Sequence, residues 1–182
     1  MASLCSVKED DRCLNQLDRG YNARVKAPQQ SQDFPDSFYR VSVKGLYVRE
    51  GKILLCEDWT ANNLFKGEKA AWELPGGGLD FGETPQEGIK REVREEMGVE
   101  VAWIADKPTY AWTRRREHSR GMDWFYSIII AYRFELRDLN ITPSEECRSI
   151  KFFTQEELKV EPDLNSQTEA FRDIFNPADF KE

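Results

Sequence analysis

The feature that most constrains the fold is a proline and three consecutive glycines, followed closely by strong helix-start signals. In the stretch PGGGLDFGE the glycines permit unusual dihedral angles and close approach by other groups. Thr84 then fits a helix N-cap, Pro85 fits the first helical position, and Glu87 completes a capping box. Gly98 stands where a helix C-terminus is commonly closed. The sequence therefore predicts a glycine-rich loop joined to a helix over residues 85–97.

Helical periodicity separates an apolar stripe from an acidic sector on this helix. The stripe comprises Ile89, Val93 and Met97, and the sector comprises Glu92, Glu95 and Glu96. Three like charges at helical spacings repel one another, and a hard divalent cation with oxygen ligands relieves that repulsion. The alternative is a solvated helix with an i, i+4 ladder through Glu87, Arg91 and Glu95. The glycine-rich loop directly upstream favours the cation site.

Alternating and β-branched segments predict a sheet around this loop and helix. The predicted strands are YRVSVKGLYV, ILLC, VEVAWI, WFYSIIIAYRFEL and SIKFF, with the first two joined as a hairpin through REGK. The fourth segment is apolar enough to be central in a sheet. Two later helices follow, a short one capped by Thr154 and Glu157 and an amphipathic one over residues 166–175. This order predicts a mixed sheet covered by helices.

Length and composition limit the classes of function. A chain of 182 residues fits one domain, which we expect over residues 36–182, preceded by a polar extension over residues 1–35 that lacks a clear period. The net charge of −7 disfavours polymeric nucleic acid and anionic membrane as partners. The four cysteines lack CxxC spacing, and no segment resembles a signal peptide or a membrane span. A cytoplasmic protein is the simplest interpretation.

The loop and helix together carry a recognisable motif. A glycine, five residues, a glutamate, seven residues and then an Arg-Glu-aliphatic-x-Glu-Glu-x-Gly-aliphatic run are all present. The matching residues are Gly77, Glu83, Arg91, Glu92, Val93, Glu95, Glu96, Gly98 and Val99. With the flanking ELPGG and KFFTQEEL, the chain resembles a Nudix hydrolase over roughly residues 38–160. The resemblance implies an α+β protein with an α/β/α sandwich and a mixed β-sheet.

The same resemblance implies a chemistry and a set of site residues. It implies a hydrolase of acid anhydrides that cleaves a nucleoside diphosphate linked to another group with Mg²⁺ or Mn²⁺. The implied metal ligands are Glu92, Glu95, Glu96 and the Gly76 carbonyl. Glu92 is also the leading candidate for general base, while Arg91 and Glu83 would orient the carboxylates. In many relatives a further glutamate joins the site, and Glu146, just before SIKFF, is the first choice, with Glu145 next.

Substrate choice is less constrained. Arg114, Arg116 and Arg120 fall in TRRREHSRGMDW, a predicted loop whose guanidinium groups suit substrate phosphate, although a solvated turn is an equal alternative. We expect a small-molecule nucleotide, with a nucleotide sugar or ADP-ribose favoured. The alternatives are a nucleoside triphosphate pyrophosphohydrolase of the house-cleaning type and a non-catalytic nucleotide-sensing domain. The terminal apolar stripe is most simply packing, with a homodimer contact as the alternative.

Overall fold

The computed structural model describes residues 39–60, 70–119 and 122–181; within them only the backbone is described for residues 116–119 and 122–125. The predicted polar extension over residues 1–35 lies outside the described residues. Within the described part, no helix combines the length and the apolar character needed to cross a membrane.

In the described part of the chain, eight strands form two four-stranded sheets. The first contains β1 (Tyr39–Leu46), β5 (Val101–Ile104), β6 (Tyr110–Ser119) and β7 (Met122–Leu136), and the second contains β2 (Val48–Arg49), β3 (Lys52–Asp58), β4 (Ala71–Glu73) and β8 (Ile150–Phe153). β1 runs parallel to β7, whereas the other strand pairs among the described residues are antiparallel. The first sheet is therefore mixed, as predicted.

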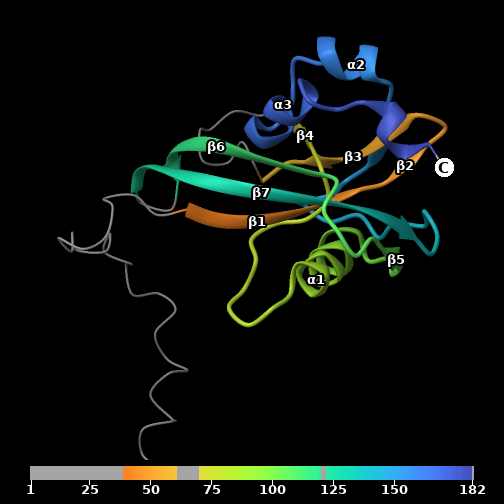
Figure 1. Ribbon diagram of the computed structural model, residues 1–182, viewed down its shortest axis with the longest axis horizontal. Coiled ribbons are helices and arrows are strands. Elements are labelled where there is room, and N and C mark those ends of the chain that lie inside the picture. Colours follow the sequence, from red (N-terminus) through yellow and green to blue (C-terminus); the bar gives the residue numbers. More distant parts are fainter. Residues whose placement is uncertain (1–38, 61–69, 120–121, 182) are drawn as a thin grey trace, which may run out of the picture. The chain divides into compact units, whose positions relative to one another are not determined.

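Helices cover both sides of the strands. Helix α1 (Pro85–Met97) lies on one side, while α2 (Gln155–Val160) and α3 (Ser166–Arg172) lie on the other, followed by a 3-10 helix at Pro177–Phe180 (Figure 1). Two apolar clusters correspond to the two sides. The first packs Ile89, Val93 and Met97 of α1 against the strands, and the second packs Phe171 and Phe175 against them. This is the α/β/α arrangement of an α+β protein that the sequence predicted.

The apolar segment around Ile129 occupies the centre of the first sheet, as predicted. β7 pairs with β1, β5 and β6, and its middle, residues 126–131, is paired on both edges. Ala131 and Phe134 are fully buried on opposite faces, in different apolar clusters. Both faces of this strand are covered, which explains its nearly continuous apolar sequence.

Two local predictions were wrong. The predicted opening hairpin is limited to β2 and β3, which turn through Glu50 and Gly51, both with positive φ. The longer strand before it, β1, pairs with β7 instead. The predicted loop over residues 113–124 is mostly strand, because β6 and β7 continue their antiparallel pairing as far as Ser119 and Met122. In both cases long-range strand pairing decides the structure, which local sequence patterns do not encode.

The candidate active site

Helix α1 begins and ends where the sequence predicted. The Glu87 backbone N–H donates to the Thr84 hydroxyl at 3.3 Å, and the Thr84 N–H donates to the Glu87 carboxylate at 2.8 Å. Gly98 adopts the left-handed conformation with φ 67°, and its N–H donates to the Arg94 carbonyl. These two caps fix the rotation and length of α1, so the acidic sector stays beside the glycine-rich loop.

The glycine-rich loop is held against the free edge of β1. Backbone hydrogen bonds join Val43 N–H to the Gly77 carbonyl at 2.8 Å, Gly45 N–H to Pro75 at 2.8 Å and Leu79 N–H to Val41 at 3.1 Å. The loop therefore acts as an extra edge segment rather than a free connection. It lies so close to α1 that a β-carbon on Gly77 would stand 2.7 Å from the Glu92 carboxylate carbon.

Arg91 gathers the carboxylates of the site. Its guanidinium donates to both oxygens of Glu83, at 2.7 and 3.0 Å, and also to Glu92 at 2.8 Å and Glu95 at 3.2 Å. A further donation reaches the Gly78 carbonyl at 3.0 Å. The hydrogen bonds from Arg91 lower the pKa of Glu83, with help from the Asp80 backbone N–H. Arg91 thus supplies the positive charge that offsets the repulsion between neighbouring glutamates.

Glu96 differs from the other two glutamates of the sector because it is buried. One of its carboxylate oxygens accepts from the Gly76 backbone N–H at 3.0 Å. Burial raises the pKa of Glu96 to about 8, although the positive charge of Lys44 and the Gly76 hydrogen bond act in the opposite direction. The two neighbours on α1 are more open, since Glu92 is half-buried and Glu95 is exposed.

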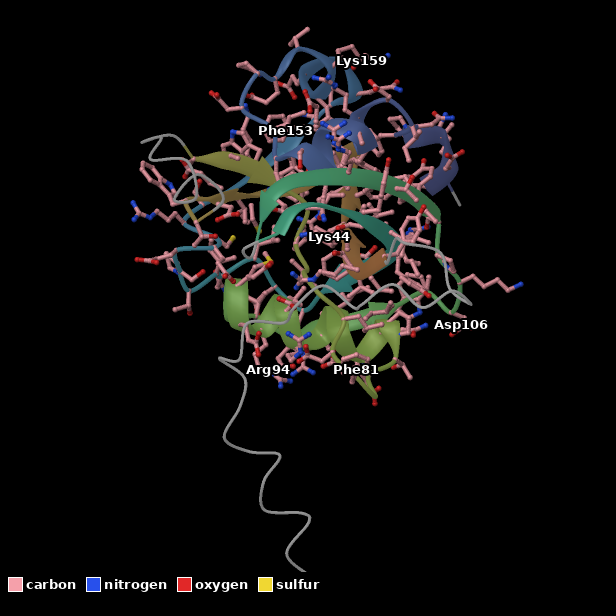
Figure 2. All side chains as sticks on the ribbon, turned by 90° about the vertical axis from the view of Figure 1, so that its left-hand side faces the viewer. Lys44, Phe81, Arg94, Asp106, Phe153 and Lys159 are labelled. Atoms are coloured by element: carbon pink, nitrogen blue, oxygen red, sulfur yellow. The ribbon has the colours of Figure 1, made fainter. Side chains whose placement is uncertain are left out.

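Lys44 is a site residue that the sequence analysis missed. Its ammonium group is almost fully buried, lies 2.6 Å from the Glu73 carboxylate and donates to the Gly76 carbonyl. Burial alone would lower the pKa of Lys44, but the charges of Glu73 and Glu96 outweigh burial and raise it. Figure 2 shows Lys44 in the interior, whereas Arg94 and Phe81 lie on the outer side near α1. One feature of the sequence could have identified Lys44, because a lysine within an otherwise largely apolar strand needs a polar or charged partner.

Glu146 lies in a loop that is tied to this site. The Ser144 hydroxyl donates to the Glu96 carbonyl at 2.7 Å, and the Trp59 N–H donates to the Glu145 carbonyl at 2.9 Å. Partial loss of hydration raises the pKa of Glu146, and the negative charges of Asp58 and Glu92 raise it further. The structure therefore brings Glu146 within electrostatic reach of the α1 carboxylates, although the two lie more than fifty residues apart in sequence.

The three arginines that were predicted to bind substrate phosphate differ in how far the structure describes them. Arg114 lies in β6 and not in a loop, and its guanidinium donates to Glu169 of α3 at 3.2 Å. Its Nε atom is buried and has no hydrogen-bond partner among the described residues, and the same holds for the hydroxyl of its cross-strand partner Ser127. The side chain of Arg116 and the whole of Arg120 lie outside the described part of the structure.

The donors of the site fit a hard divalent cation by type but are not arranged around one. Glu92, Glu95, Glu96 and the Gly76 carbonyl offer the oxygen ligands that Mg²⁺ and Mn²⁺ prefer. Among the described residues, however, no three acidic, histidine or cysteine side chains converge as a ready-made metal site. The reason is visible in the contacts, since Arg91 holds Glu92 and Glu95 while Glu96 faces Gly76.

The raised pKa of Glu96 predicts how the stability of the metal-free protein depends on pH. Between the ordinary value of 4.5 and about 8, the folded chain keeps a proton on Glu96 that the unfolded chain releases. The free energy of unfolding should therefore fall as pH rises through this window. Lys44, whose pKa is raised, stays charged in both states here and adds no slope.

Urea unfolding in EDTA at pH 5.5 and pH 8.5 measures this difference. A Glu96→Gln variant serves as the control, because it removes this titrating group and should reduce the dependence between the two conditions, while the raised pKa of Glu146 leaves a fall of the same sign. An equally steep fall in Glu96→Gln would show that another group causes it.

Comparisons with known proteins agree with this geometry. The family model of the NUDIX domain matches residues 38–174. The nucleoside triphosphatase NudI of Enterobacter sp. (strain 638) is 31% identical over 135 residues, which cover 71% of this chain and 91% of the relative. The crystal structure of a MutT protein from Methanosarcina mazei Go1 is similar with a TM-score of 0.61 and 22% identity, covering 81% of this chain and 100% of that one. The chain therefore belongs to the Nudix hydrolase family.

Proposed function

We propose that the protein is an Mg²⁺-dependent hydrolase, also served by Mn²⁺, that cleaves the diphosphate linkage of a nucleoside diphosphate derivative. Nudix hydrolases act on small nucleotide substrates and generally use divalent metals. The observation that carries the proposal is the arrangement around Arg91, which collects Glu83, Glu92 and Glu95 beside the Gly76 loop. Charged residues that served only solubility would not need to be concentrated beside a loop that is hydrogen-bonded to the sheet.

The metal ligands we propose are Glu92, Glu95, Glu96 and the Gly76 carbonyl. A bound ion supplies neutralisation of the phosphate oxygens and a lower pKa for an attacking water. Arg91 binds only one oxygen of Glu92 and one of Glu95, so the second oxygen of each carboxylate could bind a cation. Glu83, bound to Arg91 through both oxygens, keeps the guanidinium in place beside these two carboxylates.

The proton of the attacking water goes to a carboxylate of the chain. Glu92 is our first choice as this base, because its carboxylate lies against the Gly77 backbone at the edge of the buried contact. Water oxygen forms a bond to phosphorus, the bridging P–O bond breaks, and its electron pair leaves with the departing phosphate. Glu146 is the second choice, since its raised pKa favours holding a proton once accepted.

The relatives affect the choice of substrate to test first. The relative with 31% identity is named as a nucleoside triphosphatase, and this chain covers 91% of it. Nucleoside triphosphates, including the deoxy forms, are therefore the first candidates, ahead of the nucleotide sugars and ADP-ribose that the sequence analysis favoured. We place the enzyme in the cytoplasm, because Cys56 and Cys147 are buried as free thiols.

A substrate panel with Mg²⁺ tests the proposal. Nucleoside triphosphates, nucleotide sugars and ADP-ribose are each incubated with the protein, and the products are separated as mononucleotide, pyrophosphate or sugar phosphate. The products identify both the substrate class and the bond that breaks. If folded protein binds nucleotide but hydrolyses none of these compounds, the non-catalytic sensing alternative replaces the proposal.

Arg114 provides a prediction about substrate binding. We propose that its partly exposed guanidinium donates to substrate, so Arg114→Ala should raise KM about tenfold, the size of one charge-assisted hydrogen bond, with kcat nearly unchanged. Steady-state kinetics on the best substrate of the panel measures both constants. Glu169→Gln is the control, because it breaks the same ion pair at 3.2 Å while leaving Arg114 in place. An equal KM in wild type and Arg114→Ala would assign Arg114 to structure alone.

A further inference from the structure

Lys44 is buried to an extent that lysine rarely reaches. Only 3% of its surface is exposed, and it lies on β1 beside Ala131 of β7, with the buried side chains of Ser42 and Leu46 on the same face. An ammonium group in such surroundings needs close oxygen partners, since burial without them is very costly. The described residues provide these partners from one place, the short segment from β4 to the glycine-rich loop.

Two oxygen-bearing groups contact this ammonium, and a third group binds one of them. Glu73, the last residue of β4, has a carboxylate oxygen 2.6 Å from the Lys44 Nζ atom. The Gly76 carbonyl accepts a hydrogen bond from the same atom. Glu96 binds the other end of the Gly76 residue, through its N–H at 3.0 Å. A cation is thus already present at Gly76, supplied by the chain itself.

We propose that Lys44 is a built-in cation of the active site, occupying beside the oxygens of Gly76 and Glu73 the place that a further divalent ion would otherwise take. The inference rests on the proposed function in one respect, namely that Gly76 and Glu96 belong to the metal-binding site. Its consequence is that divalent ions bind on the outer side of the cluster, towards Glu92 and Glu95. Lys44 is therefore a positioning residue that limits the number of ions the site accepts.

The competing explanation is an ordinary buried ion pair that stabilises β1 against β4 and has no connection with cation binding. The two explanations differ in what removal of the ammonium does. If Lys44 fills a cation position, Lys44→Ala leaves oxygens and space that a hydrated ion can enter. If it only stabilises the fold, the variant loses stability and binds metal as before.

Counting bound Mn²⁺ distinguishes these cases without measuring turnover. Free Mn²⁺ is followed by electron paramagnetic resonance during titration of wild type, Lys44→Ala, Lys44→Met and Lys90→Ala. We expect Lys44→Ala to bind one Mn²⁺ more per chain than wild type. Lys44→Met should add no site, because its uncharged side chain has similar length and fills the space. Lys90→Ala removes the same charge from an exposed position of α1 and should match wild type.

Thermal unfolding with EDTA or Mn²⁺ gives a second readout. Mn²⁺ should raise the Tm of Lys44→Ala more than that of wild type or Lys90→Ala, because the additional ion binds only folded protein. Equal Mn²⁺ numbers and equal Tm increments in Lys44→Ala and wild type would overturn the proposal. A Lys44→Ala chain that stays unfolded at saturating Mn²⁺ would also overturn it, since an open cation site would have been filled.

Failure of the proposed function and failure of the inference about Lys44 give different results. Wild type that hydrolyses no compound of the substrate panel removes the enzymatic proposal. The prediction that Lys44→Ala binds one Mn²⁺ more than wild type would still stand in that case, because it compares the two proteins under the same conditions and does not depend on turnover.

Discussion

Replacing Glu92 by glutamine should lower kcat at least about hundredfold, the low end of what a general base contributes. The substitution keeps the shape of the side chain and its place beside Gly77, but removes the charge that binds a cation and accepts a proton. Its effect on folding should be small, because Arg91 keeps its two hydrogen bonds to Glu83. Steady-state turnover of the best substrate, with urea unfolding of the same preparation, measures both quantities.

Glu100→Gln is the matched control for this experiment. Glu100 is exposed just after α1 and pairs with Arg94 at 3.0 Å, outside the carboxylate cluster, so its variant should turn over like wild type. Unchanged turnover in Glu92→Gln would remove Glu92 from the catalytic role. If Glu146→Gln then showed the hundredfold loss instead, the general base would be Glu146, whose pKa is already raised by burial and by the surrounding carboxylates.

The sequence predicted the parts of the site that short-range interactions determine. Thr84, Pro85 and Gly98 act within one turn of the residues they cap, so their types and spacing are enough to place both ends of α1. The rotation of the helix then follows from its apolar residues, which bury Ile89 and Val93 completely. Because the side chains of one helix face have fixed angular positions, the acidic sector could also be predicted.

The parts that the sequence did not predict depend on contacts between distant segments. Lys44 and Glu73 lie on strands that do not pair with each other, and the chain between them includes all of β3. Periodicity identifies strands but not their partners, so neither this ion pair nor the parallel pairing of β1 with β7 was accessible. The sequence analysis expected Arg91 to orient the carboxylates, but its simultaneous hydrogen bonds to Glu83, Glu92 and Glu95 depend on its rotamer, which sequence spacing does not determine.

Gly76→Ala should be strongly destabilising, by at least about 2–4 kcal/mol, because two independent penalties coincide. Gly76 has φ 115°, a region that side-chain-bearing residues rarely enter. A β-carbon there would also collide with the Val43 carbonyl oxygen, which is backbone and cannot rotate away. Moving the loop to relieve this collision breaks its hydrogen bonds to β1. Urea unfolding measures the loss, and turnover should fall with it because Gly76 contacts both Lys44 and Glu96.

Gly82→Ala separates the two penalties in the same loop. Gly82 has φ 89°, but a β-carbon on it would meet no atom within 4 Å, so this variant carries the backbone strain without the collision. Its cost should be only about 1–2 kcal/mol, typical of a positive φ at a non-glycine residue. The difference between the two variants then measures the close approach of the loop to β1. Equal losses of unfolding free energy in the two variants would mean that the close approach of the loop to β1 adds nothing to the cost, and that backbone conformation alone determines the path of the loop.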